Sequence, residues 1–154
     1  MEICNTSSAT EGTDVDAACW DELLGMGKKI FGVATDDGHS MSDHCKGWVM
    51  VNSENKIDSI LDALERGDFY SSTGPEIYDF YIGDDNRAHI KCEGVQKIYF
   101  ISDCHPNQYA KAEDDTLTEA SADMNYCGGY KYIRAAIYKK DGSRAWTNPI
   151  WIEE

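Results

Sequence analysis

Two hydrophobic patterns divide this chain of 154 residues. Residues 1–67 alternate short apolar runs with segments of helical period, whereas residues 68–154 carry short runs of strand composition separated by turn signals such as Gly83-Asp84-Asp85-Asn86. Alternating strands and helices are typical of an α/β layer, and consecutive short strands are typical of a small antiparallel sandwich. We therefore predict an α/β domain over residues 1–67 and a sandwich-like, all-β domain over residues 68–154.

The first pattern begins with a strand, a helix and a second strand. A short strand is expected at residues 2–5, and a strand buried on both faces is expected at the apolar run 30–34. The helix between them is expected to use Asp14 or Asp16 as its N-cap and to end near Gly27. This order predicts parallel pairing of the two strands with a right-handed crossover.

A second helix is the most regular feature of the sequence. It follows an expected strand at residues 47–52 and ends at Gly67, a residue suited to the position after a helix. Its apolar residues, at helical spacing, are Ile57, Ile60, Leu61 and Leu64. Because an apolar stripe of this kind is normally buried, both helices are expected to lie on a face of the sheet.

Five strands are expected in the second half of the chain. They cover residues 76–82, 88–92, 97–101, 130–138 and 144–152. The stretch 108–125, rich in Ala, Asp, Glu and Thr, predicts a long loop. Trp146 and Trp151 are expected to pack in the sandwich core, and the alternative is that their aromatic faces recognise carbohydrate or another subunit.

The charge of the chain restricts its partners. Twenty-eight acidic residues against 14 basic ones give a net charge of −14. Phosphate backbones and anionic bilayers would be repelled, so neither nucleic acid nor membrane is expected as a partner. No apolar run approaches the ~20 residues of a membrane span, and the first residues lack the basic start and apolar core of a signal peptide. We therefore expect a cytoplasmic protein.

The cysteine pattern argues against a zinc ribbon, because no C-x-x-C pair occurs. The six cysteines are Cys4, Cys19, Cys45, Cys92, Cys104 and Cys127. A chain with 42% hydrophobic residues can build a core without disulfides, so free, buried thiols in a reducing compartment are expected. A soft-metal site formed by Cys104, His105 and Cys127 is the alternative that the spacing leaves open.

Two acids and a histidine stand where the apolar run 30–34 ends. Asp37 and His39 form a D-x-H pair, a carboxylate and an imidazole able to converge on one metal ion, and Gly38 between them allows the backbone to turn. In the alternative interpretation, Asp36 or Asp37 caps the next element and His39 is solvated. The D-x-H pair alone does not decide between the two.

Five short sequence segments nevertheless occur together in a fixed order. They are Glu2-Ile3-x-Asn5, Asp36-Asp37-Gly38-His39, Gly47-Trp48-Val49-Met50-Val51, GDFYSSTGPEI at residues 67–77, and Ala145-Trp146-Thr147-Asn148-Pro149-Ile150-Trp151. Together they resemble the C-terminal part of PHP-domain (polymerase and histidinol phosphatase) metallohydrolases, and most of all the CehA/McbA-like branch. That family folds as a distorted seven-stranded α/β barrel with metal ions at the C-terminal ends of its strands. The resemblance therefore predicts the last portion of such a barrel in residues 1–67.

The resemblance also implies a function. It assigns Asp37 and His39 as metal ligands, and its possible site-lining residues are Glu2, Asn5, Asp36 and His44. It implies a divalent metal (Zn, Mn or Fe), weakly bound in this chain, and a small phosphoester substrate for the parent protein. Because the family's H-x-H motif and intermediate ligands are absent, we expect a C-terminal fragment that is inactive alone. A non-catalytic binding or oligomerisation module built on the β-rich domain is the alternative.

An incomplete barrel also predicts self-association. The strands at Ile3 and Ile30 would keep an open edge, and their inner faces would lack the opposite barrel wall. Exposing that apolar surface is unfavourable. We therefore expect a homo-oligomer whose interface includes residues 1–35.

Overall fold

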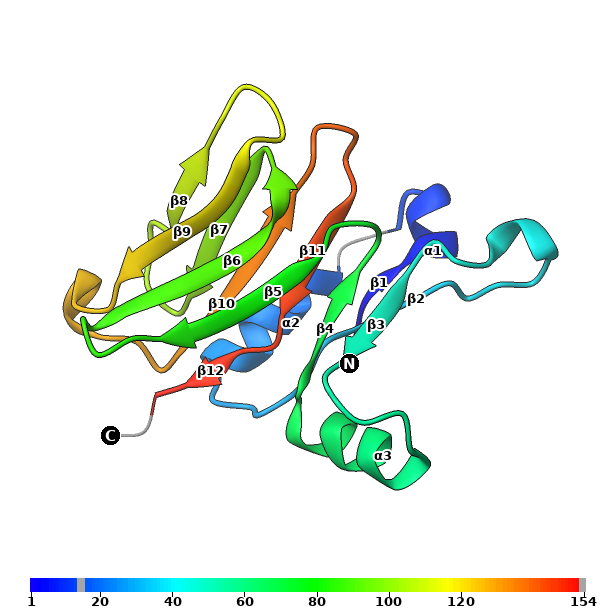
Figure 1. Ribbon diagram of the computed structural model, residues 1–154, viewed down its shortest axis with the longest axis horizontal. Coiled ribbons are helices and arrows are strands. Elements are labelled where there is room, and N and C mark those ends of the chain that lie inside the picture. The colour runs from blue at the N-terminus through cyan, green and yellow to red at the C-terminus, as the bar shows by residue number, and fades with distance from the viewer. Residues whose placement is uncertain (14–15, 153–154) are drawn as a thin grey trace.

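A seven-stranded antiparallel sheet lies in the middle of the computed structural model, which describes residues 1–13 and 16–152 (Figure 1). Its strands, in spatial order, are β3 (Trp48–Val51), β4 (Phe69–Ser72), β11 (Arg144–Thr147), β10 (Tyr132–Tyr138), β7 (Lys97–Ser102) and β8 (Gln108–Lys111), and β12 (Ile150–Trp151) also pairs with β10. Every pairing in this sheet is antiparallel. The prediction of a β-rich, antiparallel second half of the chain is confirmed, and β3 of the first half joins the same sheet.

A three-stranded sheet covers one face of the central sheet. Its order is β5 (Ile77–Ile82), β6 (Arg87–Val95) and β9 (Leu117–Asp123), again antiparallel. The core between the two sheets is made of aliphatic side chains such as Ile90 from β6 and Ile98, Ile133 and Ile137 from the central sheet. Each of these four side chains is at most 1% exposed, so the pair of sheets forms the expected sandwich.

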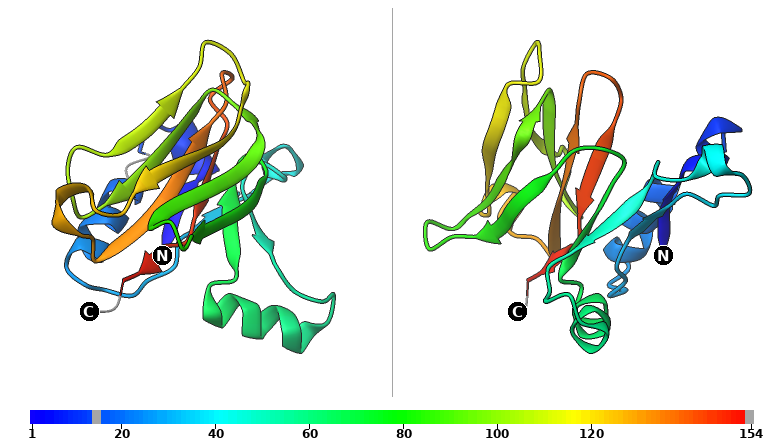
Figure 2. Two further views of the ribbon diagram at one scale, coloured as in Figure 1. Left: turned by 60° about the vertical axis from the view of Figure 1, so that its left-hand side comes forward. Right: turned by 45° about the vertical axis from the view of Figure 1, so that its right-hand side comes forward.

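The N-terminal segment covers the opposite face of the central sheet, as the right-hand view of Figure 2 shows. This layer consists of β1 (Glu2–Asn5), α1 (Thr6–Thr10), α2 (Asp16–Gly25) and β2 (Val33–Thr35). Its core side chains Ile3, Trp20 and Leu24 pack with Tyr132 and Trp146 of the central sheet. Trp146 is therefore a core residue, as predicted.

Strand β10 lies between the two cores, and its sequence explains how both of its faces can be buried. Six of its seven residues are buried, so the strand has no solvent-facing side. Ala135 and Ala136 are completely buried on opposite faces, Ala135 in the sandwich core and Ala136 against the N-terminal layer. Small side chains in the middle of the strand let both outer layers approach closely, which is consistent with the density of protein interiors.

Two polar side chains attach the segment before β2 to the central sheet. The Ser71 hydroxyl donates to the carbonyl of Gly32 (2.9 Å) and accepts from the amide of Ala34 (3.0 Å). Asn148 Oδ1 accepts from the amide of Gly32 (3.0 Å), and its Nδ2 donates to the carbonyls of Gly67 and Phe69 (3.1 and 3.0 Å). Side chains thus take the place of backbone ladder bonds between this segment and its neighbour in the sheet.

A buried ion pair makes a second connection between the layers. Arg134 on β10 is 1% exposed and donates from Nε and Nη2 to the two carboxylate oxygens of Asp21 on α2, at 2.7 and 2.6 Å. The guanidinium carbon also lies 4.6 Å from the centre of the Trp20 ring. Bidentate geometry and the aromatic face together hold a charge that would be costly to bury alone.

The structure does not support a portion of a PHP-type α/β barrel. β1 and β2 are parallel, as predicted, but they form a separate two-stranded sheet, and β3 pairs antiparallel with β4. In the run 30–34 only the last two residues belong to β2, because the residues before them bond to side chains. The expected domain boundary between residues 67 and 68 lies between α3 (Ile57–Arg66) and β4. The strands before and after α3, β3 and β4, pair with each other in one sheet.

Two predictions about local structure are wrong. The helix α3 does not lie on a sheet face, because Ile57 is 78% and Leu61 53% exposed, and Ala63 is its one buried residue. The stretch 108–125 contains β8 and β9 instead of a long loop. Ala, Asp and Glu are depleted in strands, so pairing with β6, in which Ala122 is completely buried, decides the conformation. Asp14 lies outside the described residues, and so does the side chain of Asp16.

One cysteine pair differs from expectation. Cys104 and Cys127 form a disulfide between the end of β7 and the turn η2 (Tyr126–Gly128), so the predictions of free thiols and of a soft-metal site are both wrong there. The β8 and β9 strands return the chain over 23 residues and bring the two sulfurs together. Disulfides persist mainly in oxidising compartments, so the cysteine pattern no longer supports a cytoplasmic location, which stays a prediction. No helix of the described residues is long and apolar enough to cross a membrane.

The structure also bears on the reason given for self-association. Ile3 is 1% exposed and Ala34 4% exposed within a single chain, because α2 and the central sheet cover them. The uncovered apolar face that an incomplete barrel would leave at Ile3 is therefore filled by this chain's own side chains. Oligomerisation through residues 1–35 stays a prediction that now lacks this support.

Candidate functional site

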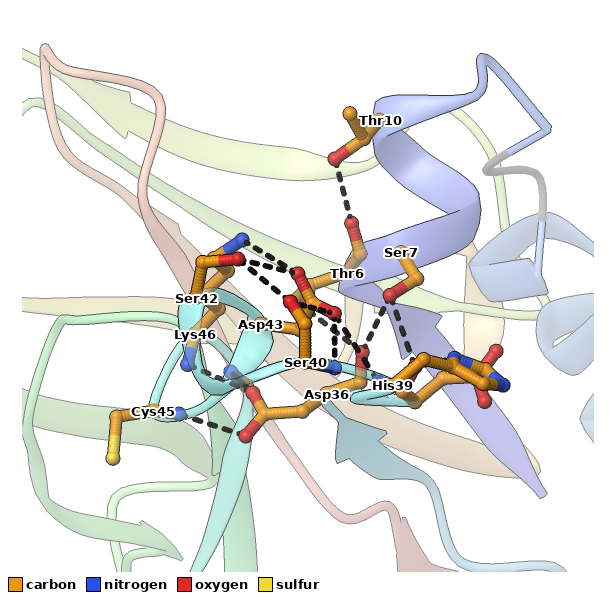
Figure 3. A network of polar contacts seen from close by, with 12 residues as sticks. Thr6, Ser7, Thr10, Asp36, His39, Ser40, Ser42, Asp43, Cys45 and Lys46 are labelled. Carbon is orange, nitrogen blue, oxygen red and sulfur yellow. Dashed lines mark hydrogen bonds and ion pairs between the residues drawn. The ribbon is translucent and has the colours of Figure 1, made fainter.

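The candidate site lies where the parallel strands β1 and β2 end. The chain leaves β2 into a loop of residues 36–47, called here the β2–β3 loop, which contains the turn η1 (Met41–Asp43). The helix α1 follows β1 directly and lies beside the start of this loop (Figure 3). The Thr6 and Ser7 hydroxyls both donate to the carbonyl of Asp36, at 3.2 and 3.0 Å, and so fix the exit of β2.

Asp36 holds the two ends of the β2–β3 loop together. Its carboxylate accepts from the amides of Cys45 (2.7 Å), Lys46 (2.8 Å) and Gly47 (2.8 Å), as Figure 3 shows for the first two. These amide bonds, that of Gly47 first, lower the pKa of Asp36 below its usual value. All three bonds use the carboxylate to close the loop, which is a structural role and agrees with the capping interpretation of Asp36.

We predict that the Asp36→Asn variant loosens the β2–β3 loop. An amide side chain has one acceptor oxygen, so at least one of the three bonds is lost, and we expect the amides of residues 45–47 to exchange with solvent severalfold faster. Hydrogen exchange followed by NMR measures this. Unchanged protection in the variant would show that the loop is held by other contacts.

The pH dependence of the same loop follows from the pKa shift. A carboxyl group whose pKa is lower in the folded state stabilises the fold fully above its unfolded pKa of about 3.9, and this contribution disappears as the pH falls through the folded value. The amides of residues 45–47, which bond to Asp36, should therefore stay protected from hydrogen exchange down to about pH 4 and lose protection below it. The Asp36→Asn variant should lack this transition.

Asp37 adopts a left-handed backbone conformation, with φ of +49°. Its carbonyl accepts from the Ser7 hydroxyl (3.1 Å) and from Nδ1 of His39 (2.8 Å), and its carboxylate accepts from Nδ2 of Asn5 (3.1 Å). Asn and Asp tolerate this conformation better than most residues do, because their short side chains bond locally. Asp37 is thus held in place by its carbonyl and by one carboxylate oxygen.

His39 is exposed, but its ring is oriented. With Nδ1 as the donor to the Asp37 carbonyl, the lone pair is on Nε2, on the far side of the ring. A backbone carbonyl that accepts from one ring nitrogen is the usual second contact of a metal-ligating histidine. The amide of His39 also donates to Asp43 Oδ2 (3.1 Å), so the backbone beneath the ring is fixed too.

The other predicted site residues divide into two groups. Asn5 joins Glu2 and Asp37, because its Nδ2 donates to both carboxylates, at 3.3 and 3.1 Å, while its Oδ1 accepts from the amide of Ser8 and caps α1. Glu2 in turn accepts a hydrogen bond from the Thr35 hydroxyl. The ring of His44 lies against Gly38, the residue between Asp37 and His39.

Residues that the sequence interpretation missed hold the β2–β3 loop in shape. Asp43 Oδ2 accepts from the amide of Ser40 (2.8 Å) and from its hydroxyl (2.9 Å), and Ser7 bridges the carbonyls of Asp36 and Asp37. The spacing of Ser40 and Asp43 is that of a capping box, a signal readable in the sequence. The role of Ser7 depends on contacts across 29 residues and has no local signal.

This arrangement provides fewer ligands than a metal ion needs. A stable site uses at least three protein ligands, and the described residues contain no group of three or more His, Cys, Asp or Glu placed to hold one. Asp37 and His39 carry donor atoms of the kinds that ligate metal ions, and among residues 1–13 and 16–152 no third such group joins them.

No protein-family model matches this chain, and neither a curated protein nor a solved structure shows significant similarity to it.

Proposed function

We propose that this chain provides part of the metal site of a PHP-type phosphoesterase, with Asp37 and His39 as two of its ligands. The single observation that carries the proposal is the hydrogen bond from His39 Nδ1 to the Asp37 carbonyl, because it directs the Nε2 lone pair outward. The proposal depends on the carboxyl ends of the parallel pair β1 and β2 and not on a barrel within this chain. The remaining ligands would come from polypeptide outside the described residues.

The chain's own residues would prepare the site before any metal binds. Asn5 restrains the Asp37 carboxylate, Ser7 restrains the Asp37 carbonyl, and Asp36 closes the loop behind both. Divalent ions in such hydrolases lower the pKa of a bound water and neutralise charge on the phosphoryl oxygens. The substrate class that follows is a small phosphoester, as the resemblance implies.

We predict that the purified chain binds Zn²⁺ or Mn²⁺ weakly and that His39→Ala removes most of this binding. Two ligands hold a metal ion poorly, so a dissociation constant of roughly 10 μM to 1 mM is expected, weakened about tenfold or more by the loss of the imidazole. Isothermal titration calorimetry measures both values.

The matched control is His105→Ala, which removes an exposed imidazole elsewhere in the chain. It should bind metal as the wild type does. Equal affinities in wild type and His39→Ala would contradict the proposed site. Equal losses in both histidine variants would indicate nonspecific binding to surface imidazoles.

A further inference from the structure

An open groove of about 840 Å³ lies away from the β2–β3 loop, between the sandwich and the start of β4. It is called here the edge groove. One wall is formed by residues 76–80, at the start of β5, and the opposite wall by residues 66–70 and the end of β3. Its aromatic lining includes Phe31 and Trp151, whose ring centres lie 5.4 Å apart.

The edge groove runs along the edge of β5 and not over one of its faces. Successive side chains of a strand point to opposite faces, so a groove bordered by five consecutive residues must follow the strand's edge. β5 is the terminal strand of the three-stranded sheet in the described part of the chain, and β6 is its one ladder partner there. The Tyr70 hydroxyl is hydrogen-bonded to the backbone of Ile77, so the part of the other edge available for pairing begins after Ile77.

The register shows which backbone groups point into the edge groove. The amide of Gly83 donates to the carbonyl of Arg87, so this pair is hydrogen-bonded. Hydrogen-bonded and non-bonded pairs alternate in an antiparallel ladder, and Phe80 opposite Ile90 is therefore a non-bonded pair. The amide and carbonyl of Phe80 point away from β6, toward the open edge.

The side chains that line the edge groove carry a net negative charge, with Asp68, Glu76 and Asp79 against Arg66, and outside the lining Lys29 Nζ lies 5.9 Å from the centre of the Trp151 ring. Arg66 is neutralised by Asp68, 2.8 Å from its Nε, whereas the exposed Glu76 and Asp79 have no ion-pair partner within residues 1–13 and 16–152. Loss of hydration raises the pKa of the Tyr78 hydroxyl, and the charges of Glu76 and Glu93 raise it further. A ligand here meets aromatic surface beside uncompensated carboxylates, which favours a cation.

We propose that the edge groove binds an extended, basic segment of a partner protein, which pairs with β5 as an additional strand. Strand addition to an open sheet edge is an established mode of peptide recognition, with backbone bonds giving affinity and side-chain contacts giving specificity. Lys or Arg side chains of the segment would meet Glu76 and Asp79, and apolar ones would meet the aromatic wall. A second copy of this chain is a poor occupant, because each copy carries a net charge of −14. This inference is independent of the phosphoesterase proposal.

The first test uses three synthetic hexapeptides with the purified chain. One alternates Lys and Val, the second has the same sequence with every backbone amide N-methylated, and the third replaces Lys with Glu. We expect the first to shift the NMR signals of residues 76–80, and the other two to bind at least tenfold more weakly, since one cannot pair with the edge and the other is repelled. Equal binding of the N-methylated peptide would overturn strand addition, and shifts confined to other residues would overturn the location.

The second test removes the acidic side chains of the groove. The double variant Glu76→Gln/Asp79→Asn should bind the Lys-Val peptide about fivefold more weakly, the effect of losing two exposed ion pairs. The matched control is Glu113→Gln/Glu119→Gln, which removes two exposed acids outside the groove. An equal loss in both double variants would show that net charge alone attracts the peptide and would overturn the proposed site.

Discussion

Replacing Asp21 with alanine is expected to destabilise the protein by about 3 kcal/mol, because the substitution leaves the Arg134 guanidinium buried without its counter-charge. Arg134 is 1% exposed and lies under α2, where the Asp21 carboxylate satisfies two of its nitrogens. The Asp21 side chain is 31% exposed, so water can partly replace it, and the expected cost lies at the lower end of the range for broken buried pairs. Urea unfolding followed by tryptophan fluorescence measures the change.

Two comparison variants separate the buried charge from the helix surface. Glu22→Ala removes an exposed acid from the next position of α2 and should change the stability by less than about 0.5 kcal/mol. The double variant Asp21→Ala/Arg134→Met removes both charges and should be more stable than Asp21→Ala alone, since no unpaired charge remains in it. A double variant that shows the full sum of two independent losses would contradict this account of the ion pair.

The contact between Asp21 and Arg134 could not be predicted from the sequence. The capping signals at Asp14 or Asp16 and at Gly27 correctly indicated a helix between them, and the strand at β10 was expected with nearly its observed bounds. That the helix would lie on β10 was not predicted, because helix and strand are separated by more than 100 residues and were assigned to different domains. The signal available was the run Tyr132–Tyr138, whose near-continuous apolar character is typical of a strand covered on both faces.

For helix α3, the conformation could be predicted from the sequence but the burial could not. Its period and its end at Gly67 were readable, because they depend on local geometry, whereas its N-cap is Lys56 and not the expected Ser53 or Asn55. The burial of this helix could not be predicted, because an apolar stripe does not identify the surface that covers it. In the described residues Ile57 and Leu61 remain exposed.

The D-x-H pair was interpreted correctly only as far as its local geometry. The residue with a left-handed backbone is Asp37 and not Gly38, whereas Asp36 does cap a backbone segment, as the alternative interpretation had it. The bond from His39 to the Asp37 carbonyl, which gives the metal proposal its support, arises from the left-handed conformation of Asp37. Sequence patterns do not reveal a positive φ at an aspartate, so this hydrogen bond could be identified only in the three-dimensional structure.

The second large effect is expected at Asn148. This residue is 9% exposed and satisfies three backbone groups of two separate segments: the amide of Gly32 and the carbonyls of Gly67 and Phe69. The Asn148→Ala variant leaves all three without that partner in a buried place. At about 1 kcal/mol or more for each, we expect a loss of about 3 kcal/mol in the free energy of unfolding. The exposed Asn52→Ala is the control and should cost less than about 0.5 kcal/mol.

The loss at Asn148 should also be local, and this separates it from a general weakening of the fold. Ser71 remains as the other attachment of the segment before β2, so Asn148→Ala should accelerate exchange of the Gly32 amide more than that of Ala34, whose bond goes to Ser71. Adding Ser71→Ala should expose both amides and release β2 from the central sheet, while the amides of β6 and β7 keep their protection. Uniform loss of protection in all strands of Asn148→Ala would contradict the local role, and wild-type exchange at Gly32 would show that the side-chain bond does not hold this segment.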